Sequence, residues 1–242
     1  MILQSFEADP AELEGRTVIR SRSAGAWMGQ QRPGAREVRL RALLYARSAQ
    51  EANNLRDQVI AATYGHKDPV LIRFARGGTQ VRMSGFLVGR PRFERLEDTR
   101  FDYTVDLLFR CPDPRIYANS ATTVAATTGG ATAVNAGNAP TYPTFTFEGP
   151  DSGGPITSLT VDINGRELVL EDISLSTGQT LTIVTTPGEE RIQRSGGVSY
   201  IGKRAAGSQF PYLEPGTNTV KYAATGGTPA TRNCTFRSAW WS

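Results

Sequence analysis

The sequence predicts a chain in two parts: an α+β N-terminal part of antiparallel strands with one helix, then an all-β sandwich. Three observations predict it. The 242 residues include 25 Gly and 14 Pro, an excess typical of many turns between short strands. Many segments alternate apolar and polar residues with the period of a strand, and one segment has a capped helical pattern. The composition changes abruptly at residues 119–139.

That segment, NSATTVAATTGGATAVNAGNA, has no charge, no aromatic residue and no strong hydrophobic periodicity. We therefore expect residues 119–139 to be a flexible or extended linker between domains over 1–118 and 140–242. The two sides differ in charge. Residues 1–118 carry 19 basic and 14 acidic residues, whereas residues 119–242 carry 8 and 9.

Residues 36–47, REVRLRALLYAR, predict a half-buried strand, and the residues after it predict a helix. Apolar side chains recur at every second position, and polar or charged ones fill the positions between them. The apolar members are Val38, Leu40, Ala42 and Leu44. Ser48 and Glu51 form the pattern of a capping box at a helix start, and Gly65 is suited to end that helix.

Two hairpins are predicted after the helix. Strands over 69–75 and 79–89 are joined by Arg76-Gly77-Gly78, and strands over 92–96 and 100–110 are joined by Glu97-Asp98-Thr99. In the last strand apolar and aromatic residues occupy one face, while Asp102, Thr104, Asp106 and Arg110 occupy the other. The first part is therefore predicted to be a meander of antiparallel strands covered by one helix.

The second half is predicted to contain only strands and turns. Seven short strands are expected, over residues 142–149, 156–163, 166–170, 180–185, 197–202, 218–224 and 232–238. Asn164-Gly165 is a strong two-residue hairpin signal between two of them. Short strands with turns every 8–12 residues indicate a β-sandwich of jelly-roll or galectin-like type.

One motif resembles the surroundings of a catalytic serine. Residues 151–155, DSGGP, match the centre of the chymotrypsin-like signature, and His66, Asp102 and Ser152 follow the order of a triad. However, Pro150 stands where the signature needs a glycine, and the stretch between His66 and Ser152 is too short for two barrels. We therefore predict a turn between strands, and no catalytic residue.

Other ligand-binding patterns are incomplete. Residues 197–203, GVSYIGK, fit a phosphate-binding loop only until Arg204, which replaces the Ser or Thr that would hold Mg²⁺. One histidine and two distant cysteines, Cys111 and Cys234, do not make a zinc site, and we expect two buried free thiols. The carboxylate pairs Glu171-Asp172 and Glu189-Glu190 fit solvated loops. We predict no metal and no cofactor.

Targeting signals and an extended basic stripe are missing from the sequence. No apolar run is long enough to span a membrane, and residues 1–15 are acidic and lack the pattern of a signal peptide. The arginines alternate with carboxylates and apolar residues. We therefore expect neither membrane insertion nor sequence-specific nucleic-acid binding.

Four segments together resemble the siphophage distal tail protein (Dit) family. They are the strand, helix and hairpin series over 36–59 and 69–89, the long strand and proline-rich end over 101–118, the entry GNAPTYPTFTFEGP over 137–150, and FPYLEPGTNTVKY over 210–222 with Trp240-Trp241. In this family a PG-x-N turn precedes a late sandwich strand. Here that turn is Pro215, Gly216 and Asn218.

The resemblance implies a structural protein of the virion tail tip, assembled in the cytoplasm of a bacterial host. It implies an N-terminal belt domain that closes into a ring, usually hexameric, and a galectin-like C-terminal domain. The ring would join the tail tube protein to the tail hub and surround the channel for DNA and the tape measure protein. No enzymatic activity is implied. A phage, a prophage and a gene-transfer particle are equally compatible with it.

Alternating charge in residues 36–110 fits a ring surface, and four residues are the predicted ring interface: Arg39, Arg41, Tyr45 and Arg47. The alternative function is a carbohydrate-binding module that attaches to host surface glycans through the sandwich. Trp27, Trp240 and Trp241 would stack on sugars in that case, or serve as core or interface anchors in the other.

Overall fold

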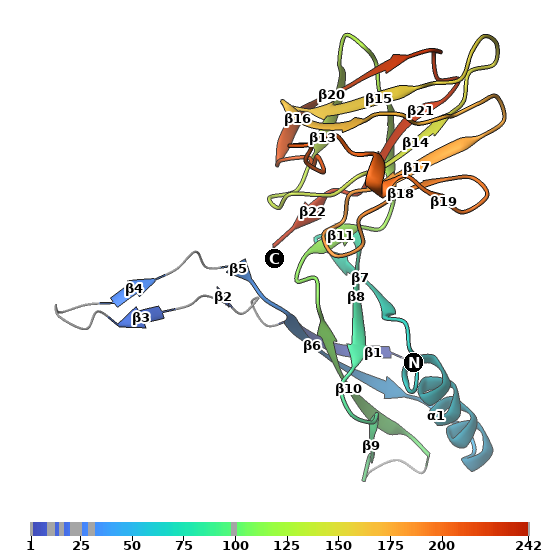
Figure 1. Cartoon of the computed structure of the whole chain (residues 1–242). Helices are drawn as coiled ribbons and strands as arrows, with labels where there is room; N and C mark the ends of the chain where they lie inside the picture. Colours follow the sequence, from blue (N-terminus) through green and yellow to red (C-terminus); the bar gives the residue numbers. More distant parts are fainter. Residues whose placement is uncertain are drawn as a thin grey trace. The chain divides into compact units, whose positions relative to one another are not determined.

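The computed structural model describes residues 2–8, 13–14, 17–19, 26–28, 32–97 and 101–241. The chain divides into two compact units (Figure 1). Unit 1 comprises Met1–Ile116 and Trp241–Ser242, and unit 2 comprises Tyr117–Trp240. Both consist mainly of antiparallel strands, and the described residues contain one α-helix, so the predicted β-rich α+β class is confirmed.

Unit 1 is built on one antiparallel sheet in the order β1-β6-β10-β8, in which β7 pairs with β8 and β9 with β10. Its strands are β1 (Ile2–Ala8), β6 (Arg36–Leu44), β7 (Val70–Arg76), β8 (Thr79–Leu87), β9 (Arg92–Arg95) and β10 (Tyr103–Cys111). β6 and β10 pair along their whole length, from Leu44 opposite Tyr103 to Arg36 opposite Cys111. This ladder is the centre of the unit.

One face of that sheet forms the core of unit 1. Val38 of β6 and Phe109 of β10 lie opposite each other and are both buried, as are Ala42 and Val105. Met83 of β8 is also buried. The period of two in the sequence therefore predicted the buried face correctly, because residues directly opposite in an antiparallel ladder share a face.

The helix α1 (Ala49–Thr63) begins and ends where the sequence predicts. The Ser48 hydroxyl accepts a hydrogen bond from the Glu51 amide at 3.2 Å. The Glu51 carboxylate accepts from the Arg47 amide at 2.8 Å, one residue earlier than in a standard capping box. Gly65 follows the C-cap with φ +78°, a conformation that favours glycine.

Both predicted hairpins form. Gly77 and Gly78 have φ values of 53° and 82° and make the two-residue turn between β7 and β8, while Arg76 is the last residue of β7. β9 pairs with β10, but the connection expected at Glu97-Asp98-Thr99 lies partly outside the described residues. Two short ladders lie between β1 and β6 in the sequence: β2 (Leu13–Glu14) with β5 (Arg32–Pro33), and β3 (Thr17–Ile19) with β4 (Ala26–Met28).

Unit 2 contains two main sheets. The first has the order β12-β21-β14-β17-β18-β19 and the second β13-β20-β15-β16. The strands of the first are β12 (Thr122–Ala125), β14 (Thr144–Glu148), β17 (Thr180–Val184), β18 (Arg191–Arg194), β19 (Val198–Ser199) and β21 (Arg232–Phe236). Those of the second are β13 (Ala131–Asn135), β15 (Ser158–Ile163), β16 (Arg166–Leu170) and β20 (Gly216–Thr225). The 3₁₀ turn η1 (Ile201–Lys203) also lies in unit 2, and the two remaining short strands of the chain are β11 (Ile116–Ala118) and β22 (Ala239–Trp240).

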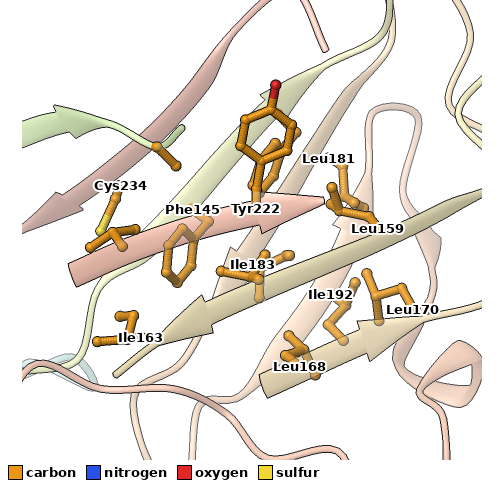
Figure 2. Packing of buried hydrophobic residues seen from close by; sticks show 14 of the residues in the cluster. Phe145, Leu159, Ile163, Leu168, Leu170, Leu181, Ile183, Ile192, Tyr222 and Cys234 are labelled. Atoms are coloured by element: carbon orange, nitrogen blue, oxygen red, sulfur yellow. The ribbon is translucent and has the colours of Figure 1, made fainter. Parts of the chain in front are cut away.

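The two sheets enclose a single apolar core, as expected of a β-sandwich (Figure 2). Phe145 from the first sheet and Leu159 from the second are completely buried in the same cluster, together with Leu181 and Ile183. The strands of both sheets alternate between these core positions and outward polar ones, typically threonine in β14 and β17. Most of the buried hydrophobic residues that the structure describes therefore belong to the sandwich.

The prediction that residues 119–139 form a linker is wrong. β12 and β13 lie within it and pair with β21 and β20, so this segment belongs to both sheets of the sandwich. Its buried positions are small or polar: Ala126, Ala133 and Asn135 are all fully inaccessible. A strand whose core side chains are alanine and asparagine has little hydrophobic signal in its sequence.

Six of the seven strands expected in the second half are present as β14, β15, β16, β17, β20 and β21. The seventh, over 197–202, is different: only Val198–Ser199 is a strand, and η1 follows it. The sequence reading missed β18, a short strand with Ile192 as its single buried residue.

Candidate functional site

The second face of the unit 1 sheet carries charged side chains. It holds four arginines and four carboxylates on β1, β6, β9 and β10. We call it the charged face; its charged members are Glu7, Glu37, Arg39, Arg41, Arg92, Glu94, Asp106 and Arg110. It is the surface opposite the core of unit 1, because residues on alternate positions of a strand point to opposite faces.

Every arginine on the charged face lies opposite or beside a carboxylate of a neighbouring strand. Arg41 is 3.9 Å from the Glu94 carboxylate and 4.0 Å from that of Asp106. Arg39 lies opposite Glu7 in the β1–β6 ladder. The charged face is close to neutral, because its arginines and carboxylates are equal in number. Its ion pairs are exposed and individually weak, so they add little to the stability of unit 1.

An apolar strip borders the charged face. Leu71, Phe86 and Val88 are 39%, 39% and 42% exposed, although large apolar residues are normally covered. Phe86 lies opposite Arg110, and the Val88 amide donates to the Leu108 carbonyl at 2.7 Å, which continues the ladder. Exposed apolar side chains that lie together often mark an interaction site.

The four predicted interface residues are all exposed, but they do not lie on one element. Arg39 and Arg41 lie on the charged face of β6. Tyr45, with 52% of its surface exposed, and Arg47 lie in the connection from β6 to α1. The sequence reading missed Glu94 and Asp106 as partners of Arg41, because it did not specify which strands are neighbours.

The helix is attached to the sheet through an arginine that the sequence reading also missed. The Arg56 guanidinium lies 5.1 Å from the ring centre of Phe93 and 5.4 Å from that of Tyr103. Cation–π contacts of this kind favour arginine, whose planar group stacks on aromatic rings. Arg56 therefore positions α1 next to β9 and the beginning of β10.

Arg36 is buried at the end of the β6–β10 ladder, with 2% of its surface exposed, opposite Cys111. Its Nη2 donates to the main-chain oxygen of Trp241, whereas its Nε has no hydrogen-bond partner among the described residues. Burial lowers the pKa of Arg36 and raises the pKa of the Cys111 thiol to about 11. Cys111 and Cys234 are both buried and free, as predicted.

The residues of the serine-protease-like pattern are engaged elsewhere. The His66 ring forms a hydrogen bond of 2.7 Å with the Ala61 carbonyl, and the Asp102 carboxylate accepts from the Ala46 amide at 2.9 Å. Ser152 lies in an exposed bend. No hydrogen bond joins these three side chains in the described part of the chain, and a triad requires such bonds.

The remaining ligand patterns form no site either. Residues 197–203 fold as β19 and η1, with no α-helix to present its N-terminus to a phosphate. Among the residues that the structure describes, no group of three or more His, Cys, Asp or Glu side chains is arranged to hold a metal ion. The same residues include no helix long and apolar enough to cross a membrane.

Two tyrosines and two charged side chains of unit 2 form a cluster. The Tyr142 and Tyr212 rings are 5.7 Å apart, and the Arg166 guanidinium lies 4.1 Å from the centre of the Tyr212 ring. Arg166 also forms a 2.8 Å ion pair with Glu214. Burial, followed by the charge of Glu214, raises the pKa of Tyr212. All four side chains are half-buried.

Of the three tryptophans, the structure describes the side chains of Trp240 and Trp241. Trp240 is half-buried in β22, and Trp241 binds Arg36 through its main-chain oxygen. Trp27 lies in β4, and its side chain is outside the described residues.

No known sequence family matches the chain, and no curated protein does. Solved structures do. The Dit protein of phage SPP1, described as a paradigm of the hub adsorption apparatus in phages that infect Gram-positive bacteria, superposes with a TM-score of 0.71. It is 17% identical, and the alignment covers 98% of this chain and 93% of that one.

Two structures of the phage P2 baseplate in its activated conformation, one with Ca and one with Sr, each superpose with a TM-score of 0.53. Their identities are 10% and 11%, and the alignments cover 96% and 95% of this chain and 90% and 88% of the others. The similarity expected from the sequence is thus confirmed at the level of the fold: along nearly its whole length, this chain is folded like a distal tail protein.

Proposed function

We propose that this chain is a structural protein of a phage tail tip. The observation that carries the proposal is the shared fold with the SPP1 Dit protein across both units. In this role the chain forms a ring, usually of six copies, between the tail tube protein and the tail hub. The ring surrounds the channel for DNA and the tape measure protein. It acts in the virion after assembly in the host cytoplasm, without a cofactor or a catalytic step.

Within this proposal unit 1 is the belt domain and unit 2 is the galectin-like domain. The charged face supports a subunit contact in unit 1, because neutral alternating charges beside exposed apolar side chains suit a specific interface. Arg39, Arg41, Tyr45 and Arg47 remain the proposed ring-interface residues. A ring contact joins two different surfaces of identical chains, which neighbouring copies repeat until the circle closes.

The solution mass of the chain tests the proposal. Light scattering across concentration is expected to show an assembly of about six copies of the 26.2 kDa chain, imaged as a ring by electron microscopy. Changing both Arg39→Glu and Arg41→Glu should raise the concentration needed for assembly about tenfold or more, because like charges then face each other. The matched control is Arg191→Glu, an exposed arginine of β18. Intact rings in the double variant would exclude these arginines from the interface.

A second candidate function, attachment to host surface glycans, is favoured by the cluster of Tyr142, Arg166, Tyr212 and Glu214 in unit 2. Tyrosine rings offer sugars an apolar surface, and arginine and glutamate supply hydrogen bonds. A glycan array probed with the full chain tests it. Binding that disappears in Tyr212→Ala, and persists in the control Tyr200→Phe, would support glycan attachment; no binding by the unmodified chain would dismiss it.

A further inference from the structure

The two outermost strands of the unit 1 sheet differ in charge. Among the described strands, β1 pairs only with β6 and β7 only with β8, so they form opposite edges of the sheet. Glu7 is the single charged residue of β1, and residues 1–15 hold four carboxylates and no basic residue. Every charged residue in the hairpin of β7 and β8 is an arginine. Residues 69–93 contain five arginines and no carboxylate.

Arg73 of β7 is the arginine of this hairpin that most needs an anionic partner. Its side chain is exposed, and it lies directly opposite Arg82 in the β7–β8 ladder. Like charges in directly opposite positions of a ladder repel and destabilise it. Arg73 forms no ion pair with any carboxylate of the described residues.

Glu7 and Arg73 lie on the same face of the sheet. Glu7 lies opposite Arg39 of β6, and Phe86 of β8 lies opposite Arg110 of β10 on the same face. Leu71 and Arg73, at alternate positions of β7, also lie on this face. Within one chain β6, β10 and β8 separate the two edges. Four strand spacings amount to about 19 Å, which is too far for an ion pair.

We propose that β1 of one copy docks against the β7 edge of a second copy, with Glu7 beside Arg73. This inference rests on the proposed function, because it adds a contact between neighbouring copies of the ring. The contact joins two different edges and is therefore head-to-tail, the kind that builds rings. Pairing of like edges is disfavoured, because two β7 edges bring arginines together and two β1 edges bring carboxylates together.

Charge reversal tests the contact. Glu7→Arg alone and Arg73→Glu alone each place like charges across it, and each should raise the concentration needed for ring assembly about tenfold or more. The chain that carries both changes restores opposite charges in reversed positions. We expect it to assemble at a lower concentration than either single variant, which also shows that neither change prevents folding. Arg191→Glu is the control for a change of net charge.

Disulfide trapping is the second measurement. A chain with Glu7→Cys mixed with a chain with Arg73→Cys should give a cross-linked dimer on oxidation, because the two positions are adjacent across the contact. Cys111 and Cys234 are buried and do not compete. The control mixture replaces Glu7→Cys with Lys221→Cys, an exposed position on β20 of unit 2, and should give no dimer.

The outcomes separate this inference from the proposed function. Rings that persist in both single variants, without the cross-link, overturn the edge contact and leave the ring standing. An unmodified chain that keeps the mass of one copy, and gives no cross-link at any concentration, overturns both. If short duplex DNA binds the chain and Arg73→Glu abolishes this binding without changing the mass of the assembly, the basic hairpin is a polyanion site and the edge contact is wrong.

Discussion

At the scale of single residues, the fold depends on positions where backbone segments nearly touch. A Cβ atom on Gly137 would lie 1.7 Å from the Ala239 carbonyl oxygen, and one on Gly149 would lie 1.9 Å from that of Ser176. Where Gly137 approaches Ala239, the completely buried side chain of Asn135 accepts hydrogen bonds from the amides of both residues. The sequence reading noted Gly149 as part of a family pattern, but which backbone each glycine approaches follows only from the tertiary structure.

Gly137→Ala should therefore lower the free energy of unfolding by about 3 kcal/mol or more, because the obstructing atom belongs to the main chain and has no rotamer to change. Urea unfolding followed by fluorescence measures this. Gly154→Ala is the matched control, since a Cβ there meets open space, and it should change stability by less than about 0.5 kcal/mol. Equal stabilities for the two variants would contradict the close approach.

The buried thiols predict how stability depends on pH. Burial raises the pKa of Cys234 from an ordinary 9.0 to about 12, because the interior disfavours the thiolate. The Cys234 thiol thus keeps its proton in the folded chain at pH values where it has lost that proton in the unfolded chain. The stabilisation is fully present below pH 9 and is lost as the pH rises from about 9 toward 12.

This decline is measured by urea unfolding at pH 7, 9 and 10.5, with Cys234→Ala as the reference that lacks the titrating thiol. We expect the difference in stability between the two proteins to shrink above pH 9. A constant difference over this range would show that the Cys234 thiol does not titrate differently on folding.

At the scale of elements, the sequence identified strands wherever large apolar residues alternate with polar ones. It identified α1 from its capping residues, and the Ser48 hydroxyl does accept from the Glu51 amide. It failed for β12, which buries no residue completely, and for β13, whose buried positions are Ala133 and Asn135. It predicted the alternating charges of the strands but not which of them pair, since the pairing of Arg41 with Asp106 depends on two strands that are distant in the sequence.

The cap of α1 is a prediction at this scale. Ala52 is the single buried residue of the helix, so packing stabilises it weakly and its termini matter more. Ser48→Ala should cost about 1 kcal/mol of helix stability, whereas Ser48→Asp keeps an acceptor and should cost much less. Hydrogen exchange of the amides in the first turn of α1 distinguishes the two. Faster exchange in both variants, or in neither, would show that the cap is not the cause.

At the scale of the whole molecule, the two-part organisation was predictable from composition, but the extent of the second part was not. Unit 2 runs from Tyr117 to Trp240 and includes the uncharged segment that resembles a linker. The order of four weak motifs was enough to indicate the fold along the whole chain, and the superposition on the SPP1 Dit protein agrees with it. No single motif would have been sufficient.

The extent of unit 2 predicts which fragment folds alone. A fragment over 117–240 contains every strand of both sheets and should unfold cooperatively on heating. A fragment over 140–242 lacks β12 and β13, which exposes the edges of β21 and β20, and should show no cooperative transition. Differential scanning calorimetry compares them. A sharp transition in the shorter fragment would mean that the uncharged segment is dispensable.

The bond from Arg36 to Trp241 has a consequence for the order of events during synthesis. The two residues are 205 positions apart, and both belong to unit 1. A ribosome therefore exposes the N-terminal strands long before it makes the residue that binds their buried guanidinium. Until then Arg36 lacks that partner, and the sheet around it is incomplete. Translation itself thus delays the finished form of unit 1 until the sandwich has been made.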